Sequence, residues 1–326
     1  MRRDAVVITR ANTRSLIYLR DEATRFNHGD PALKRTRDWF LFLVVVILWS
    51  ASWPVSKDIL NYIGPLNFVL QKYSLSAIVL SPLLFFLREE IPKDKGTLLK
   101  LFLLGVINAL GVICTTIALV TETSGISAIL TYTQPLFVFF LSVLFLRSEI
   151  HLVRLLGAFV GFFGVTLLAT SRSELFHVIP FSSGLLLLGA FLWAVTIVYY
   201  KRALSDVNYV VTTMFQLVVG SLFLVPLASV SEGLSLPLTL AYILMIGYLS
   251  VFATGIGLLL WIRLMREEDV TVLSSSGFAV PVVALLLGWM LLGERVDLGL
   301  LPAILLIVLG VYLVNRPTSL PQAQNR

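Results

Sequence analysis

Two polar side chains, Lys72 and Gln216, stand inside long apolar stretches of this sequence, 144 positions apart in the chain. An ammonium group in a hydrocarbon environment is costly unless water or an anion solvates it. No Asp or Glu lies inside any membrane span predicted below, so the chain itself offers Lys72 no partner within the spans. We therefore expect Lys72 to face a water-filled cavity and to pair there with an anionic group on a small molecule.

The alternative for Lys72 is that its side chain extends to the outer lipid headgroups. Lys72 stands about six residues into its span, or ~9 Å below the boundary at a rise of 1.5 Å per residue. A lysine stem reaches that far. The match with Gln216 favours the cavity, since both positions then carry a hydrogen-bonding group toward the same substrate.

Further candidates share a position inside a predicted span. The predicted substrate-binding set is Lys72, Gln216, Trp49, Trp193, Gln134, Tyr132, Asn108 and Ser276. The two tryptophans serve either as packing or as an apolar wall or gate of the site. Pro135 and Pro281 each remove a backbone donor, which predicts helix kinks that either bend and act as gates of the site or stay static.

The sequence carries no recognisable catalytic or metal-binding pattern. HExxH, GxSxG and DxD motifs and a Walker-type loop are absent, so neither an intramembrane enzyme nor an ATP-driven pump is indicated, and no cofactor is expected. The one cysteine, Cys114, excludes an intrachain disulfide and a thiolate metal site. The three histidines, His28, His151 and His177, fall in loops or the N-terminal tail, which disfavours proton antiport through a buried group.

The elements that position these residues are membrane-spanning helices. The 326 residues are 57% hydrophobic and 13% charged, with a mean hydropathy of +0.90, which is too apolar for a soluble domain. Since about 20 apolar residues of helix cross a bilayer, we predict an all-α integral membrane protein with ten transmembrane helices, near residues 39–56, 66–87, 98–120, 124–146, 152–171, 183–200, 208–228, 238–262, 271–292 and 298–314.

The second half of the sequence repeats the first. Trp49, Lys57 and Pro82 recur 144 positions later, and Pro135 and Gly164 recur 146 positions later, as Trp193, Lys201, Pro226, Pro281 and Gly310. Because a unit of five spans is odd, the second copy must insert upside down, as in many secondary transporters. The predicted domains are a basic arm at 1–38, repeats at 39–171 and 183–314, and a tail at 315–326.

Lysine and arginine set the expected orientation. With the N-terminus inside, twenty-one of these residues are cytoplasmic and three are outside, and nine of the twenty-one lie in residues 1–38. Both termini are thus expected in the cytoplasm of a multi-pass plasma (inner) membrane protein. We interpret the arm as a cytoplasmic tail, with a lipid-binding or regulatory helix as the alternative. The net charge of +6 suits an anionic lipid surface better than nucleic acid.

These residues resemble the drug/metabolite transporter superfamily, and in particular its EamA-type ten-span members. The resemblance covers residues 39–314 and is carried by LWSASWPVS at 48–56, QPLFVFFLSVLFLRSE at 134–149 and VPVVALLLGWMLLGE at 280–294. The Pro-to-Glu distance is 14 in the first copy and 13 in the second, so identical roles for Glu149 and Glu294 are not expected. The resemblance implies transport of small metabolites such as amino acids, often as export.

Other functions stay open at this point. Lys72 would also suit an exchanger of nucleotide sugars or phosphorylated metabolites, although a phosphate usually binds more than one cation. A non-transporting sensor on the same fold would bind its ligand without flux. Gly157 and Gly161 form a GxxxG pattern that predicts tight helix packing, and the oligomeric state is not determined by it.

Overall fold

The computed structural model describes residues 31–146, 151–170, 181–267, 279–294 and 298–314. The chain divides into two compact units, residues 1–43 and 44–326, and the features described below belong to the second. As expected from the apolar composition, the described residues are helical and contain no strand. The predicted site residue Ser276, together with Glu149, lies outside the described residues.

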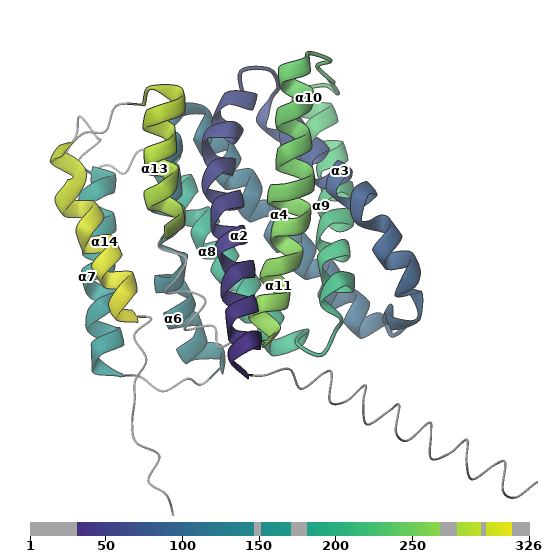
Figure 1. Ribbon diagram of the computed structural model, residues 1–326, viewed down its shortest axis with the longest axis horizontal. Helices are drawn as coiled ribbons and strands as arrows, with labels where there is room; N and C mark the ends of the chain where they lie inside the picture. Colours follow the sequence, from purple (N-terminus) through teal and green to yellow (C-terminus); the bar gives the residue numbers. More distant parts are fainter. Residues whose placement is uncertain (1–30, 147–150, 171–180, 268–278, 295–297, 315–326) are drawn as a thin grey trace, which may run out of the picture. The chain divides into compact units, whose positions relative to one another are not determined.

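The helices of the second unit stand side by side and are joined by short connections (Figure 1). In chain order, the helices are α2 (Pro31–Ile59), α3 (Pro65–Phe86), η1 (Arg88–Glu90), α4 (Lys95–Thr121), α5 (Ser124–Thr131), α6 (Gln134–Leu146), α7 (Leu152–Thr170), α8 (Phe181–Ala203), α9 (Tyr209–Ser231), α10 (Leu240–Gly247), η2 (Tyr248–Ile256), α11 (Gly257–Glu267), α13 (Ala279–Leu292), η3 (Leu298–Leu300) and α14 (Leu301–Val314).

Seven helical segments are long and apolar enough to cross a membrane, among the residues that the structure describes. Three shorter apolar helices accompany them, at Leu152–Leu167, Val280–Leu292 and Leu301–Val314. Large apolar side chains cover the outside, including Phe86 at 80% exposure and Val230 at 86%. Water would not tolerate such a surface, but lipid solvates it, so the described helices form a membrane protein.

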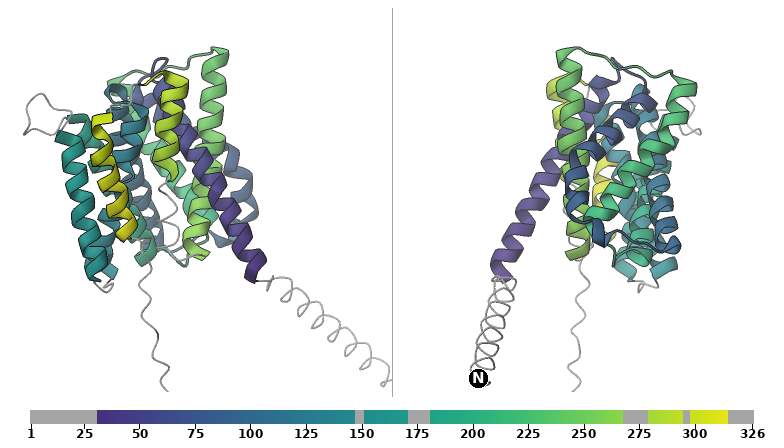
Figure 2. Two further views of the ribbon diagram at one scale, coloured as in Figure 1. Left: turned by 60° about the vertical axis from the view of Figure 1, so that its left-hand side comes forward. Right: turned by 90° about the vertical axis from the view of Figure 1, so that its right-hand side faces the viewer.

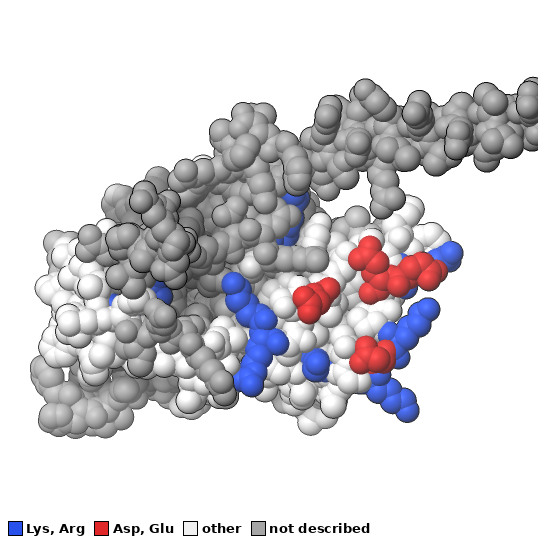
Figure 3. Space-filling model, turned by 90° about the horizontal axis from the view of Figure 1, so that it is seen from below, with Lys and Arg blue, Asp and Glu red and all other residues white. Residues whose placement is uncertain are grey.

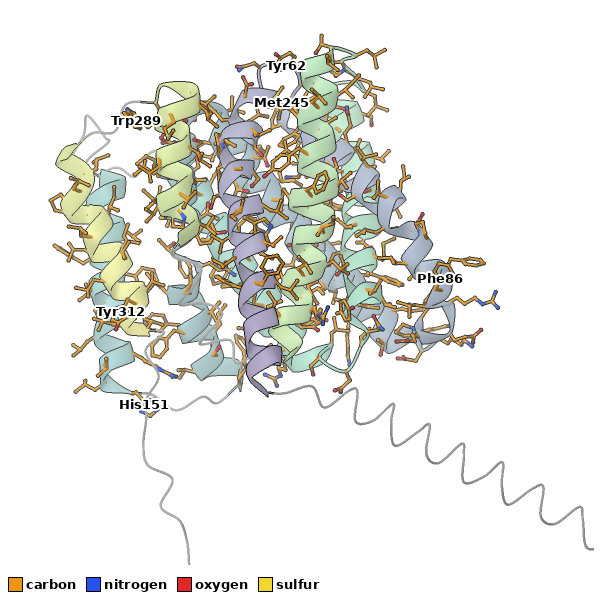
Figure 4. The ribbon with its side chains drawn as sticks, in the orientation of Figure 1. Tyr62, Phe86, His151, Met245, Trp289 and Tyr312 are labelled. Atoms are coloured by element: carbon orange, nitrogen blue, oxygen red, sulfur yellow. The ribbon has the colours of Figure 1, made fainter. Side chains whose placement is uncertain are left out.

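The helices of the second unit end at two opposite faces. Tyr62 and Trp289 lie at one end, and His151 and Tyr312 lie at the other (Figure 4). Lysine, arginine and acidic side chains gather on the face seen from below, around an otherwise uncharged surface (Figure 3). Charged side chains on this face are typical of a helix bundle that meets water at the ends of its apolar helices.

The predicted span at 124–146 is divided into α5 and α6. Helix α5 ends at Thr131 and α6 begins at Gln134, so that Tyr132 and Thr133 form a turn directly before Pro135. The Thr133 hydroxyl donates a hydrogen bond of 2.6 Å to the Leu130 carbonyl, which satisfies an acceptor that the interruption releases. The other predicted kink residue, Pro281, lies in α13, two residues after the first described residue of this helix.

The predicted span at 238–262 also departs from a regular helix. Its middle, Tyr248–Ile256, is the π-helix η2 between α10 and α11. Two of its carbonyls accept hydrogen bonds from neighbouring helices: Ser76 Oγ donates to Ser250 O at 2.6 Å, and Trp49 Nε1 donates to Ala253 O at 3.0 Å. The π-helix is therefore held in place by side chains of α2 and α3.

Helices α7 and α14 approach each other closely through glycines (teal and yellow in Figure 2). A methyl group built on Gly310 would overlap the Gly161 Cα atom, and one built on Gly157 would lie 2.9 Å from the Gly310 carbonyl oxygen. The GxxxG pattern is thus used for packing within the chain, as the sequence predicts.

Glutamates at helix ends bind the first turns of helices from distant parts of the chain. The Glu232 carboxylate accepts hydrogen bonds from the backbone N–H groups of Leu66 and Asn67, at 2.9 and 3.0 Å. Glu294 accepts from the N–H groups of Ser124 and Gly125, at 2.6 and 3.3 Å. A carboxylate is favourable at a helix N-terminus, because the first N–H groups have no partner inside the helix.

Candidate functional site

A cavity of about 230 Å³ lies among the helices of the second unit. Side chains from α2, α3, α4, α6, α8, α9, η2 and α11 line it, together with Tyr132 from the turn between α5 and α6. These helices come from both halves of the sequence. A cavity of this kind, mostly apolar with a few polar groups, is the usual form of a small-molecule site.

The structure brings together most of the residues that the sequence singled out. Lining the cavity are Lys72, Gln216, Trp49, Trp193, Gln134, Tyr132, Asn108 and the kink residue Pro135. Ser276 lies outside the described residues, and Pro281 is not part of the lining. These residues therefore border the same cavity. That they bind a substrate remains a prediction.

Lys72 projects from α3 into the cavity lining. Its Nζ atom lies 4.7 Å from the centre of the Phe68 ring, a distance at which a cation is attracted to an aromatic face. Within the described part of the chain, no carboxylate lies within ion-pair distance of this ammonium and no side chain or carbonyl accepts a hydrogen bond from it. The positive charge of Lys72 is therefore available to a bound molecule.

Gln216 and Asn108 supply amide groups from α9 and α4. Gln216 is 3% exposed, and its amide makes no hydrogen bond to the residues that the structure describes. Asn108 Nδ2 donates a hydrogen bond of 3.0 Å to the Tyr73 hydroxyl oxygen, so part of its role is to orient Tyr73. Gln216 is thus the freer of the two amides for a substrate.

Tryptophans form much of the cavity wall. Trp49 contacts Trp261 with ring centres 5.2 Å apart and a tilt of 52°. Trp53 and Trp193 line the same cavity. While the Trp49 N–H is occupied by the Ala253 carbonyl, the Trp193 N–H makes no hydrogen bond within the described residues.

Trp49 and Trp193 each lie against a glycine of the opposite half of the sequence. A methyl group built on Gly257 would lie 2.7 Å from Trp49 Nε1, and one built on Gly111 would lie 2.7 Å from Trp193 Cδ1. The two tryptophans are 144 positions apart and the two glycines 146. Glycine is needed at both places because any side chain would occupy the space of the indole ring.

Sequence reasoning missed several residues of the wall. Tyr73, Trp53 and Trp261 line the cavity, but aromatic side chains in an apolar span do not differ in type from ordinary core residues. A helical spacing could have found two of them: Trp53 follows Trp49 by one turn, and Trp261 follows Gly257 by one turn.

The lining has groups that can bind a small molecule. It contains one ammonium, several amide and hydroxyl groups and aromatic walls, and none of its described residues is an Asp, Glu or His. No group of three or more His, Cys, Asp or Glu that could hold a metal occurs among the described residues. The arrangement can neutralise one negative charge and enclose an apolar body.

Comparisons with known proteins agree with this description. The protein-family model described as "EamA-like transporter family" matches residues 38–170 and 181–316. The chain is 28% identical over 296 residues to the "Uncharacterized transporter YvbV" of Bacillus subtilis, covering 89% of this chain and 95% of that protein. It is 26% identical over 291 residues to the "Uncharacterized inner membrane transporter YedA" of Escherichia coli, covering 86% and 93%.

A solved structure, named only as "Crystal structure of protein", has a similar fold. It aligns with a TM-score of 0.64 at 18% identity, covering 85% of this chain and 96% of that one.

Proposed function

We propose that this chain, which belongs to the EamA-like transporter family, is a secondary transporter that exports small carboxylate-bearing metabolites, such as amino acids or related compounds. The observation that carries this proposal is the ammonium of Lys72 on a cavity wall, without a carboxylate partner among the described residues. In the middle of a membrane protein, such a charge favours an anionic group on a substrate. Lys72 and Gln216 bind that group, and the tryptophans enclose the remainder.

We propose further that the fold consists of ten transmembrane helices in two inverted five-helix repeats, at 39–171 and 183–314. Two reciprocal contacts between tryptophans and glycines support the inverted repeat. Trp49 of the first half packs on Gly257 of the second, and Trp193 of the second packs on Gly111 of the first. Each contact is the counterpart of the other with the two halves interchanged. Such a pair of contacts is expected when a pseudo-two-fold axis relates the halves.

The glutamates at helix ends give independent support. Glu232 of the second half binds the first turn of α3, and Glu90 of the first half accepts a hydrogen bond from Asn208, the residue that caps the first turn of α9. Since α3 and α9 are the second helix of their respective halves, the two contacts correspond. Inversion puts them on opposite sides of the membrane.

The interrupted helices suit alternating access between the two sides. The turn at Tyr132–Thr133 and the π-helix η2 both border the cavity, since Tyr132, Ala253 and Thr254 belong to its lining. Interrupted helices bend at a lower cost than regular ones, because fewer internal hydrogen bonds must break. Bending at these two places would open the cavity to one side and close it to the other.

The transport proposal is tested with purified protein in liposomes. Amino acids, organic acids, nucleobases and sugar phosphates are screened for thermal stabilisation of the protein and for uptake of the radiolabelled compound. We expect a carboxylate-bearing compound both to raise the melting temperature and to cross the membrane. Protein-free liposomes give the background rate. Binding without flux would contradict the transporter and favour the sensor, and preferred flux of sugar phosphates would favour the phosphorylated-metabolite exchanger.

The proposed topology, with both termini in the cytoplasm of the inner membrane, predicts which positions a membrane-impermeant maleimide reaches in intact cells. In a Cys114→Ser background, Tyr62→Cys and Leu234→Cys should react before permeabilisation. Lys93→Cys and Asp206→Cys should react only afterwards. All four native residues are exposed in connections between helices, so a difference in labelling reports the side of the membrane. Labelling of Lys93→Cys in intact cells would overturn this orientation.

A further inference from the structure

The charge balance of the cavity distinguishes among carboxylate-bearing molecules. Lys72 brings one positive charge, and the described lining brings no negative one. Three described carboxylates outside the lining make hydrogen bonds at helix ends: Glu232 and Glu294 bind backbone N–H groups, and Glu122 accepts a hydrogen bond from Ser182 at 2.8 Å. A monoanion therefore neutralises the charge of the described lining, whereas a zwitterion leaves the charge of Lys72 uncompensated by it.

An α-ammonium group would meet poor partners in this cavity. It stands one carbon from the carboxylate, so when the carboxylate binds Lys72, the second cation lies next to the first and is repelled. Against it, the described lining offers only neutral oxygens and aromatic faces. Lys72 itself already lies over the ring of Phe68. Hydrogen bonds between a charged and a neutral group cannot replace an ion pair fully.

The walls define the rest of the ligand. Trp49, Trp53, Trp193 and Trp261 line the cavity together with aliphatic side chains such as Val112. A body with many hydroxyl groups would leave them unpaired against these walls, which is unfavourable. A ring or a branched chain of the size of the cavity, about 230 Å³, buries its apolar surface instead.

From the charge balance and the walls, and resting on the transport function proposed above, we infer that, among the amino acids and related compounds proposed there, the cavity prefers the related monoanionic carboxylates that have an apolar body and no ammonium group. The 2-oxo acids and arylalkanoic acids that carry the same side chains are thus better substrates than the zwitterionic amino acids. The recognising groups are Lys72 and the amide of Gln216 for the carboxylate, and the tryptophans for the body.

The test uses wild-type protein in liposomes and molecules that differ only in charge. Uptake of radiolabelled phenylpyruvate, L-phenylalanine and phenethylamine is compared, and 4-methyl-2-oxopentanoate with L-leucine forms a second pair. We expect each oxo acid to cross at least ten times faster than its amino acid, and the amine to cross at the rate of protein-free liposomes. Equal or faster flux of the amino acids would overturn this inference and leave the transport proposal standing. Absence of flux for every compound, including the broad screen, would instead overturn the transport proposal.

A designed change of charge provides the second arm of the test. Asn108→Asp keeps the shape of the side chain and puts a carboxylate into the lining, where the Tyr73 hydroxyl can donate to it. It should shift the ratio of oxo acid to amino acid flux at least tenfold toward the amino acid. Asn61→Asp makes the same charge change at an exposed position and should leave the ratio unchanged. An unchanged ratio in folded Asn108→Asp protein would contradict the inference, and if this variant does not fold, the wild-type comparison decides alone.

Discussion

Replacing Lys72 with Ala is expected to lower the flux of a carboxylate substrate about 10- to 100-fold, because a charge-assisted hydrogen bond contributes about 1.5–3 kcal/mol. Stability should change little, since no carboxylate among the described residues loses its partner. Flux in liposomes and the melting temperature in detergent measure the two effects.

Two further variants interpret the loss in Lys72→Ala. Lys72→Arg keeps the charge and should retain part of the flux. Lys100→Ala removes an exposed lysine near the start of α4, away from the cavity, and should have wild-type flux. If Lys72→Ala itself transports normally, the ammonium serves the lipid headgroups, as the alternative from the sequence holds.

Replacing Gly310 with Leu should cause the largest loss of stability. A Cβ atom at this position would overlap both the N and Cα atoms of Gly161, and backbone atoms cannot rotate away as a side chain can. Helices α7 and α14 would have to separate along their interface. Overpacking of this kind costs about 1–3 kcal/mol or more, so we expect a much lower melting temperature and little monodisperse protein.

Gly184 provides the matched control for Gly310. It also lies within a helix, α8, but a Cβ atom there would meet nothing within 4 Å. Gly184→Leu should therefore keep the melting temperature of the wild type. Equal melting temperatures for Gly184→Leu and Gly310→Leu would mean that α7 and α14 are not packed through their glycines.

Much of the fold follows from the sequence because the membrane restricts the choice of structure. Long apolar runs must become helices, and the described residues confirm an all-helical membrane protein. The resemblance to EamA-type transporters is confirmed by the family match over both halves. The locations of Lys72 and Gln216 on a common cavity could also be foreseen, because polar groups in lipid-spanning helices turn toward an interior.

Contacts between helices that are distant in the chain could not be predicted from the sequence. Nothing in the residue types indicated that Glu232 and Glu294 bind the first turns of α3 and α5, since a glutamate in a loop usually faces water. Whether Glu149 has a different role from Glu294 stays a prediction, because Glu149 lies outside the described residues. The spans predicted at 124–146 and 238–262 are present, but their internal form could not be derived, since hydropathy records apolar length and is insensitive to a turn or a π-helix.

The π-helix has a counterpart in the spacing of the repeat. From the capping residue Asp94 to Gly111 the chain advances 17 residues, and from the corresponding cap Thr239 to Gly257 it advances 18. A π-helix has wider turns than an α-helix and so takes up an additional residue. The additional residue is absorbed before Gly257, which still meets Trp49 as Gly111 meets Trp193.

This one-residue difference makes the two halves unequal partners. Suppose that each half takes the conformation of the other when the cavity opens to the opposite side of the membrane. Helix α4 would then have to form the wide turns of η2, although it lacks the additional residue that those turns take up. Under the proposed inverted repeat, the two conformations would then differ in free energy even with identical solutions on both sides, and we expect the empty protein to populate one of them more. A resting bias of this origin lies in the backbone and needs no ion or ligand to set it.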